Sequence, residues 1–207
     1  MNPFFSFDDY LTTMTLFLEK EQEKHTQYIH DLFWKVESGQ TEMQGELDYA
    51  RYELDKFPEF ENTLFSSFFV MIYSFMESEL LWYCRELANR SPQSILLSDL
   101  GATNTIEKTM TYLIKVQHIE FSKKDNPEWG KIRIFTYLRN CIVHNQGRVD
   151  NFFSKQKELL KFIEKKDSKI KLEGTKCIFD KDFCLDALNT IKRFLDMVAA
   201  AKKPNVS

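Results

Sequence analysis

The chain has 207 residues, of which 43% are hydrophobic and 19 are Phe. This content is ample for a packed core and excludes a disordered chain, and the length suits one domain. Only 6 Gly and 5 Pro are present, which favours long helices over a many-stranded sandwich. The net charge of −3 gives no general indication of nucleic-acid binding.

The charge is unevenly distributed along the chain. Residues 1–62 hold 5 Lys and Arg against 14 Asp and Glu, a balance of −9. Residues 148–176 hold 9 against 5, a balance of +4. A local basic segment can contact phosphates in an acidic chain, but a solvated Lys-rich helix face explains the same pattern equally well.

Targeting and membrane signals are lacking in the sequence. The N-terminus MNPFFSFDDY has no basic region followed by an apolar run and a cleavage site. The most apolar segment, 64–76, is shorter than the about 20 residues that a bilayer-spanning helix needs. We therefore expect a soluble, cytoplasmic protein with no membrane association.

The four cysteines are Cys84, Cys141, Cys177 and Cys184. None forms a CxxC pair, and no histidine stands at zinc-finger spacing from them. We expect reduced, mostly buried thiols, with no metal site and no cofactor.

The first elements in chain order are three helices. A cap at Asp8 or Asp9 predicts a first helix to about Val36. A more polar helix is expected over 42–56, packing partly through Leu47 and Tyr52, and Pro58 ends or bends it.

The range 59–88 reads as a long helix that is apolar on nearly all sides. Such a helix is buried all round, or is buried on one side and lies in a subunit interface on the other. A loop follows, and a further helix is predicted over 103–117.

The most informative segment lies in the next helix, predicted over 127–143 with Pro127 in its first turn. Arg139 and His144 are five positions apart near its end, and Asn140, four residues before His144, shares a face with it. Gly147 stands where a C-cap is expected, which places His144 in the last turn.

The remaining segments are a Lys-rich helix over 151–165, a small β-hairpin within 169–179 and a final helix. Asp180 or Asp182 is expected to cap the final helix, which continues through Val198. These elements predict an all-α fold with a minor hairpin.

The run LRNCIVHNQG, residues 138–147, resembles the Arg-x4–6-His signature of the HEPN superfamily. The resemblance implies a single HEPN-like helical bundle over 1–207. It divides into an N-terminal helical extension, 1–57, a core bundle, 58–201, and a loose tail, 202–207.

The resemblance also implies a metal-independent endoribonuclease that leaves a 2′,3′-cyclic phosphate. Two motif helices would meet in a homodimer, with His144 as general base or acid, Arg139 as phosphate ligand and Asn140 as positioning residue. Asn145 and Glu77 would be supporting residues. The family context implies an RNA substrate, a toxin or phage-defence role, and a restraining partner such as a small nucleotidyltransferase antitoxin.

Two alternatives remain at this stage. The Arg, Asn and His side chains near a helix end are also explained by a C-cap and a salt link to a carboxylate. A catalytically inactive HEPN-type module, serving dimerisation or nucleotide binding, would carry the same motif. Glu77 and Glu79 would serve equally well as interface or solvent carboxylates.

Overall fold

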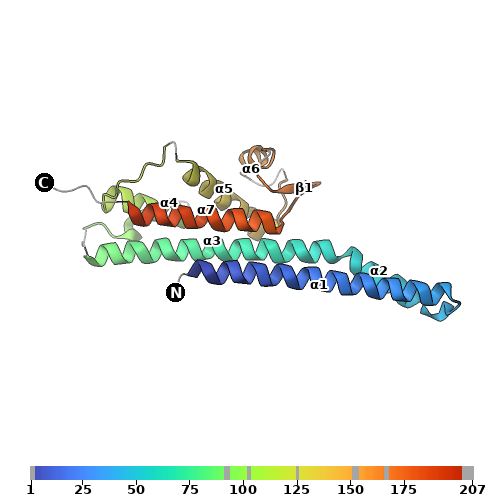
Figure 1. Cartoon of the computed structure of the whole chain (residues 1–207). Coiled ribbons are helices and arrows are strands. Elements are labelled where there is room, and N and C mark those ends of the chain that lie inside the picture. Colours follow the sequence, from blue (N-terminus) through green and yellow to red (C-terminus); the bar gives the residue numbers. More distant parts are fainter. Residues whose placement is uncertain are drawn as a thin grey trace.

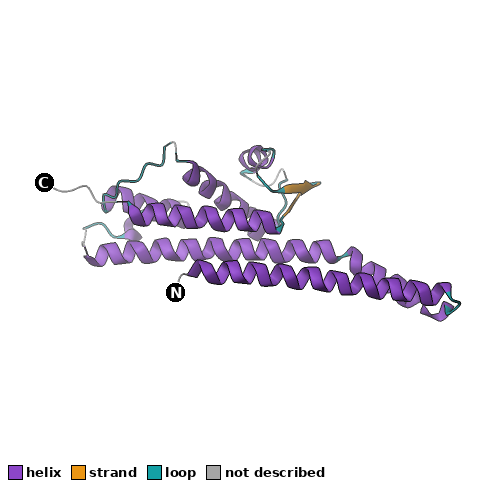
Figure 2. Ribbon diagram, in the orientation of Figure 1, coloured by secondary structure: helices purple, strands orange, loops and turns teal. Residues whose placement is uncertain are grey.

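The computed structural model describes residues 3–90, 94–101, 104–124, 126–150, 154–165 and 168–201. Over these residues the fold is all-α with one two-stranded antiparallel hairpin, which confirms the predicted fold class (Figure 2). The predicted tail, 202–207, lies outside the described residues.

Three helices form the N-terminal half: α1 (Pro3–Glu37), α2 (Gln44–Asp55) and α3 (Phe57–Arg90). The expectation that Asp8 or Asp9 caps the first helix is wrong, because α1 begins at Pro3 and both carboxylates lie within it. Proline is well tolerated at the start of a helix, where its missing N–H has no helical partner. The helical run is interrupted at Lys56, between α2 and α3, and Pro58 lies in the first turn of α3.

The second half of α1 and α2 project beyond the rest of the molecule as an antiparallel arm (Figure 1). Leu32, Leu47 and Ala50 form a small separate core between these two helices. Leu47 packs as predicted, whereas Tyr52 is 54% exposed because no other element covers that side of the arm.

The C-terminal half contains α4 (Thr105–Thr111), α5 (Pro127–Asn145), α6 (Gln156–Ile163) and α7 (Lys181–Ala200). The helix predicted over 103–117 is α4, capped by the Asn104 side chain and continued by the π-helical turn Tyr112–Val116. Asp180, one of the two candidates, caps α7 by accepting a hydrogen bond from the Phe183 N–H at 2.9 Å. The first residues of the predicted helix 151–165 lie outside the described part.

Helix α3 forms the centre of the bundle and contacts α1, α4, α5 and α7. Phe69 is fully buried, and its ring packs against those of Phe135, Phe179 and Phe183 at centroid distances of 5.5, 6.5 and 5.3 Å. Aromatic rings contribute large buried areas at such separations. The opposite side of α3 is not buried, since Trp82 is 55% exposed.

One described helical stretch, Thr41–Arg90, is long and apolar enough to cross a membrane by length and composition alone. This stretch is longer than the apolar segment 64–76, from whose length no membrane-spanning helix was expected. Its most apolar window is 39% buried inside the protein. The buried apolar side chains of α3 within this stretch belong to the main core, as in the central helix of a globular bundle.

The hairpin pairs β1 (Lys171–Glu173) with β2 (Lys176–Ile178), and Leu172 lies opposite Cys177. Arg148, which follows α5, forms a bridge with Lys176. Asn62 of α3 holds the end of β2, donating to the Cys177 carbonyl at 3.2 Å and accepting from the Phe179 N–H at 2.8 Å. The hairpin therefore ties the end of α5 to the start of α3.

Replacement of Asn62 tests this tie. Asn62 is buried, so Asn62→Ala leaves the Phe179 N–H and the Cys177 carbonyl without their partner. We expect a loss of about 1–3 kcal/mol in the free energy of unfolding, measured by urea denaturation. Thr63→Ala is the control, because Thr63 is exposed and its hydroxyl bonds only within its own helix. If both variants unfold like wild type, Asn62 does not hold the hairpin.

Candidate functional site

Helix α5 carries the Arg139–His144 motif, and its orientation is set by the core. Its N-terminus is capped by Asn126, whose Oδ1 accepts a hydrogen bond from the Trp129 N–H at 2.9 Å. Four side chains of α5 are fully buried and recur at helical spacing: Ile132, Phe135, Leu138 and Cys141. The face opposite these residues must therefore point outward.

Arg139 lies at the border between the buried face and the outward face. Its side chain is half-buried, and Nη1 donates to Oδ1 of the neighbouring Asn140 at 3.2 Å. Its Nε is buried and has no hydrogen-bond partner among the described residues. A buried guanidinium N–H without a partner is unfavourable.

Glu77 and Tyr73 of α3 form the protein environment of Arg139. Burial raises the pKa of the Glu77 carboxyl above its ordinary value, although the charge of Arg139 and a hydrogen bond with Thr105 lower it. The Tyr73 hydroxyl donates to Thr136 Oγ1 at 3.0 Å, and burial raises the pKa of Tyr73 to about 12. The predicted supporting residue Glu77 thus lies within electrostatic range of Arg139, but the two form no ion pair in the described structure.

His144 is exposed in the last turn of α5, on the same face as the half-buried Asn140. It makes no hydrogen bond or ion pair with any residue that the structure describes. Five residues correspond to about 140° around a helix of 3.6 residues per turn, so Arg139 and His144 leave α5 in different directions. Asn140 connects the two by its bond to Arg139 and by its position on the His144 face.

Helix α5 extends two residues beyond its predicted end at Val143, and its C-cap is one residue before the predicted Gly147. Gln146, with φ of 52°, is the left-handed C-cap, and Gly147 follows with φ of 74°. The Gly147 N–H donates to the Cys141 carbonyl at 3.0 Å. The predicted supporting residue Asn145 turns away from the motif, since its amide donates to Asp150 Oδ1 at 3.2 Å and to the Arg148 carbonyl.

All four cysteines are buried, as expected, and their thiols are free. Cys141, inside the motif, donates from Sγ to the Arg148 carbonyl at 3.2 Å. Its contact with Cys177, together with burial, raises the pKa of the Cys177 thiol well above its usual value. These two thiols help to join the end of α5 to the hairpin.

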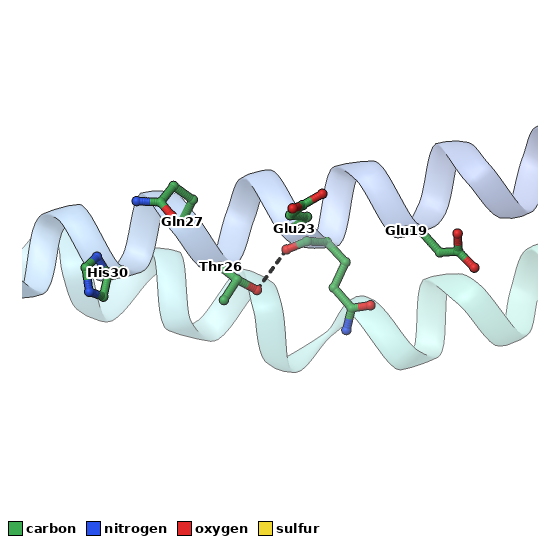
Figure 3. A pocket seen from close by; sticks show the side chains of 6 residues that line it. Glu19, Glu23, Thr26, Gln27 and His30 are labelled. Atoms are coloured by element: carbon green, nitrogen blue, oxygen red, sulfur yellow. Dashed lines mark hydrogen bonds between the residues drawn. The ribbon is translucent and has the colours of Figure 1, made fainter.

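A separate shallow surface lies on the arm, lined by side chains of α1 that include Glu19, Glu23 and His30 (Figure 3). All of the lining side chains are exposed, and Thr26 donates only to the Gln22 carbonyl of its own helix at 2.8 Å. Within the described residues no three His, Cys, Asp or Glu side chains come together as a metal site.

Two residues on the outward face of α5 escaped the sequence analysis. Arg133 and Tyr137 precede Asn140 and His144 on this face, at steps of four, three and four residues. The helical period alone would have revealed the stripe. The Arg-x4-His motif begins at Arg139, so it does not include these two earlier positions.

Glu77→Gln tests the cost of burying a carboxylate beside Arg139. The folded-state pKa of Glu77 is raised, so the stability it contributes is present at low pH and is lost as the pH rises through that pKa. Relative to wild type, the variant should gain melting temperature as the pH rises from about 4, near the ordinary carboxyl value, towards about 7. Thermal denaturation at several pH values measures this. A melting-temperature difference that does not change with pH would contradict it.

Comparison of the chain with family models, curated proteins and solved structures gives no significant match. The observations that bear on function are therefore the Arg139–His144 motif, its resemblance to the HEPN signature and the geometry of α5.

Proposed function

We propose that this protein is a metal-independent endoribonuclease of HEPN type that acts as a homodimer. One observation carries the proposal. The exposed imidazole of His144 shares the outward face of α5 with Asn140, and the half-buried Arg139 donates a hydrogen bond to the Asn140 side chain. This combines a group that exchanges protons near neutral pH with a cation suited to phosphate.

The reaction needs only groups of these kinds. A base removes the proton of the RNA 2′-hydroxyl, the 2′-oxygen attacks the adjacent phosphorus, and the bond to the 5′-oxygen breaks. An acid then protonates the departing 5′-oxygen, leaving a 2′,3′-cyclic phosphate and a 5′-hydroxyl. His144 transfers one of these protons, while Arg139 stabilises charge on the phosphate and Asn140 positions the reacting groups.

A second copy of the chain supplies what one protomer lacks. The chain contains one Arg-x4-His motif, and the mechanism uses both a base and an acid. In a twofold dimer with two α5 helices face to face, the histidine of each copy takes one role. The exposure of His144, Val143 and Gln146 at the end of α5 leaves this region free for such a contact.

A toxin or phage-defence role in the cytoplasm completes the proposal. An unrestrained ribonuclease harms its own host, so the proposal includes a restraining partner, such as a nucleotidyltransferase-type antitoxin. The acidic N-terminal arm is a surface that a basic partner would complement.

A second candidate function is a catalytically inactive module for dimerisation or nucleotide binding. The position of Arg139 beside Glu77 and Tyr73 favours it, since a guanidinium there also stabilises the packing of α5 on α3. In that case Arg139 has a structural role and His144 is an ordinary exposed side chain.

RNA cleavage in the presence of EDTA separates the two functions. We expect His144→Ala to lower the cleavage rate by roughly 10²–10⁴-fold, because a proton-transfer group is lost. Arg139→Ala should lower it by about 10²–10³-fold, because a charge-stabilising donor is lost. Mapping of the RNA ends should show cyclic phosphates and 5′-hydroxyls.

The control is His30→Ala, which removes an exposed imidazole from the arm and should leave cleavage unchanged. Melting temperatures of all variants show whether Arg139→Ala acts through stability. If wild type and His144→Ala are equally inert towards RNA while the protein remains a dimer by light scattering, the ribonuclease proposal fails and the inactive module stands.

A further inference from the structure

A groove of about 260 Å³ runs between α5 and α6. From α5 it is lined by Arg133 and Tyr137, and from α6 and the turn after it by Glu158, Lys161 and Lys165. Ile134 and Phe162 add apolar surface. The groove brings together segments that are about thirty residues apart in the chain, and it belongs to neither helix alone.

A stripe of side chains on one face of α5 leads from the groove towards His144. Arg133, Tyr137, Asn140 and His144 follow one another at steps of four, three and four residues in an uninterrupted α-helix. Side chains at this spacing form a single stripe. The eleven steps from Arg133 to His144 correspond to roughly 16 Å along the helix axis, a length that a few nucleotides can cover.

The cations of the groove are available to a ligand. Lys155 pairs with Glu158 at 3.2 Å, so the carboxylate that lines the groove is already neutralised. Arg133, Lys161 and Lys165 form no ion pair with any described residue. Three positive charges that have no ion-pair partner among the described residues therefore line one groove, which is the arrangement that binds a phosphate backbone.

Tyr137 supplies an aromatic ring among these cations. Its hydroxyl accepts a hydrogen bond from Arg133 Nη2 at 3.4 Å, and Lys155 Nζ lies 5.5 Å from the centre of its ring. The ring is half-buried, so part of it remains accessible. Aromatic rings between basic side chains stack unpaired bases with little regard to sequence.

We propose that this groove binds single-stranded RNA and leads it along α5 to His144. The inference rests on the proposed ribonuclease function for the identity of its ligand, and it names the part of the protein that holds the substrate. Arg133, Lys161 and Lys165 bind phosphates, and Tyr137 stacks a base. A paired strand offers no free base face to Tyr137, so the groove prefers single strands.

Binding is measured with a fluorescein-labelled single-stranded RNA whose sugars are 2′-O-methylated. This probe lacks the 2′-hydroxyl nucleophile, so it reports affinity whether or not the protein cleaves RNA. Fluorescence anisotropy at several salt concentrations gives the affinity and its salt dependence for the full-length protein and its variants.

The triple variant Arg133→Ala, Lys161→Ala, Lys165→Ala should bind at least roughly tenfold more weakly at low salt. The slope of log Kd against log salt should fall by about 2, since each lost phosphate contact with a single strand accounts for about 0.7. Tyr137→Ala should weaken binding roughly tenfold, and Tyr137→Phe, which keeps the ring, should not.

Lys157→Ala is the matched control. Lys157 is an exposed lysine of the same helix α6 that does not line the groove, and its replacement should leave the affinity unchanged. If Lys157→Ala weakens binding as much as Lys161→Ala does, the attraction is diffuse and the groove is not the site. If the groove variants bind RNA normally but dissociate a dimer in light scattering, the groove is a protein interface and the proposal is wrong.

Failure of this proposal is distinguishable from failure of the proposed function. A protein that binds the methylated probe through the groove but leaves ordinary RNA intact refutes the ribonuclease function alone. A protein that cleaves RNA through His144, and whose groove variants bind and cleave as wild type does, refutes the groove alone.

Discussion

The burial of one face of α5 against the aromatic centre of the bundle is the constraint on which the rest of the site depends. Ile132, Phe135, Leu138 and Cys141 have no exposed surface, and Phe135 packs against Phe69 of α3. Rotating α5 by even a quarter turn would expose several of these side chains, each of which contributes on the order of 1.5–3 kcal/mol when buried. The core therefore determines which residues of α5 reach the solvent.

This rotation gives Arg139 and His144 different environments. Among the described residues His144 has no hydrogen-bond partner at the end of the helix, whereas Arg139 lies near Glu77 and Tyr73 and holds Asn140. The guanidinium of Arg139 can thus stabilise the fold, although its buried Nε has no hydrogen-bond partner in the described part of the chain.

The C-terminal elements keep the end of α5 in place. The Arg148–Lys176 bridge, the Cys141–Arg148 hydrogen bond and the two bonds of Asn62 join α5, the hairpin and α3 within a few residues of His144. The backbone that carries His144 is therefore held by contacts with two other parts of the fold, the hairpin and α3. The acidic arm projects beyond the bundle, at the end where β1 and α6 are seen (Figure 1).

Local sequence signals were sufficient for the type of fold and for most helices. Pro127 predicts the start of α5, Asp180 or Asp182 the start of α7, and the alternation around Gly174 the hairpin, because caps, proline and turn glycines act within a few residues. The motif placed Arg139, Asn140 and His144 near one helix end for the same reason. The start of α1 was missed because a proline at position 3 competes with Asp8 and Asp9 as a start signal.

Only the tertiary structure decided which of these side chains meet others. Tyr52 is exposed because the arm projects beyond the bundle. Asn145 donates a hydrogen bond to Asp150 in the turn that connects α5 to the following segment. The electrostatic interaction of Arg139 with Glu77 joins residues 62 positions apart, and the basic groove depends on how α6 packs beside α5. Such pairings arise from packing between distant segments, and helical periodicity carries no information about them.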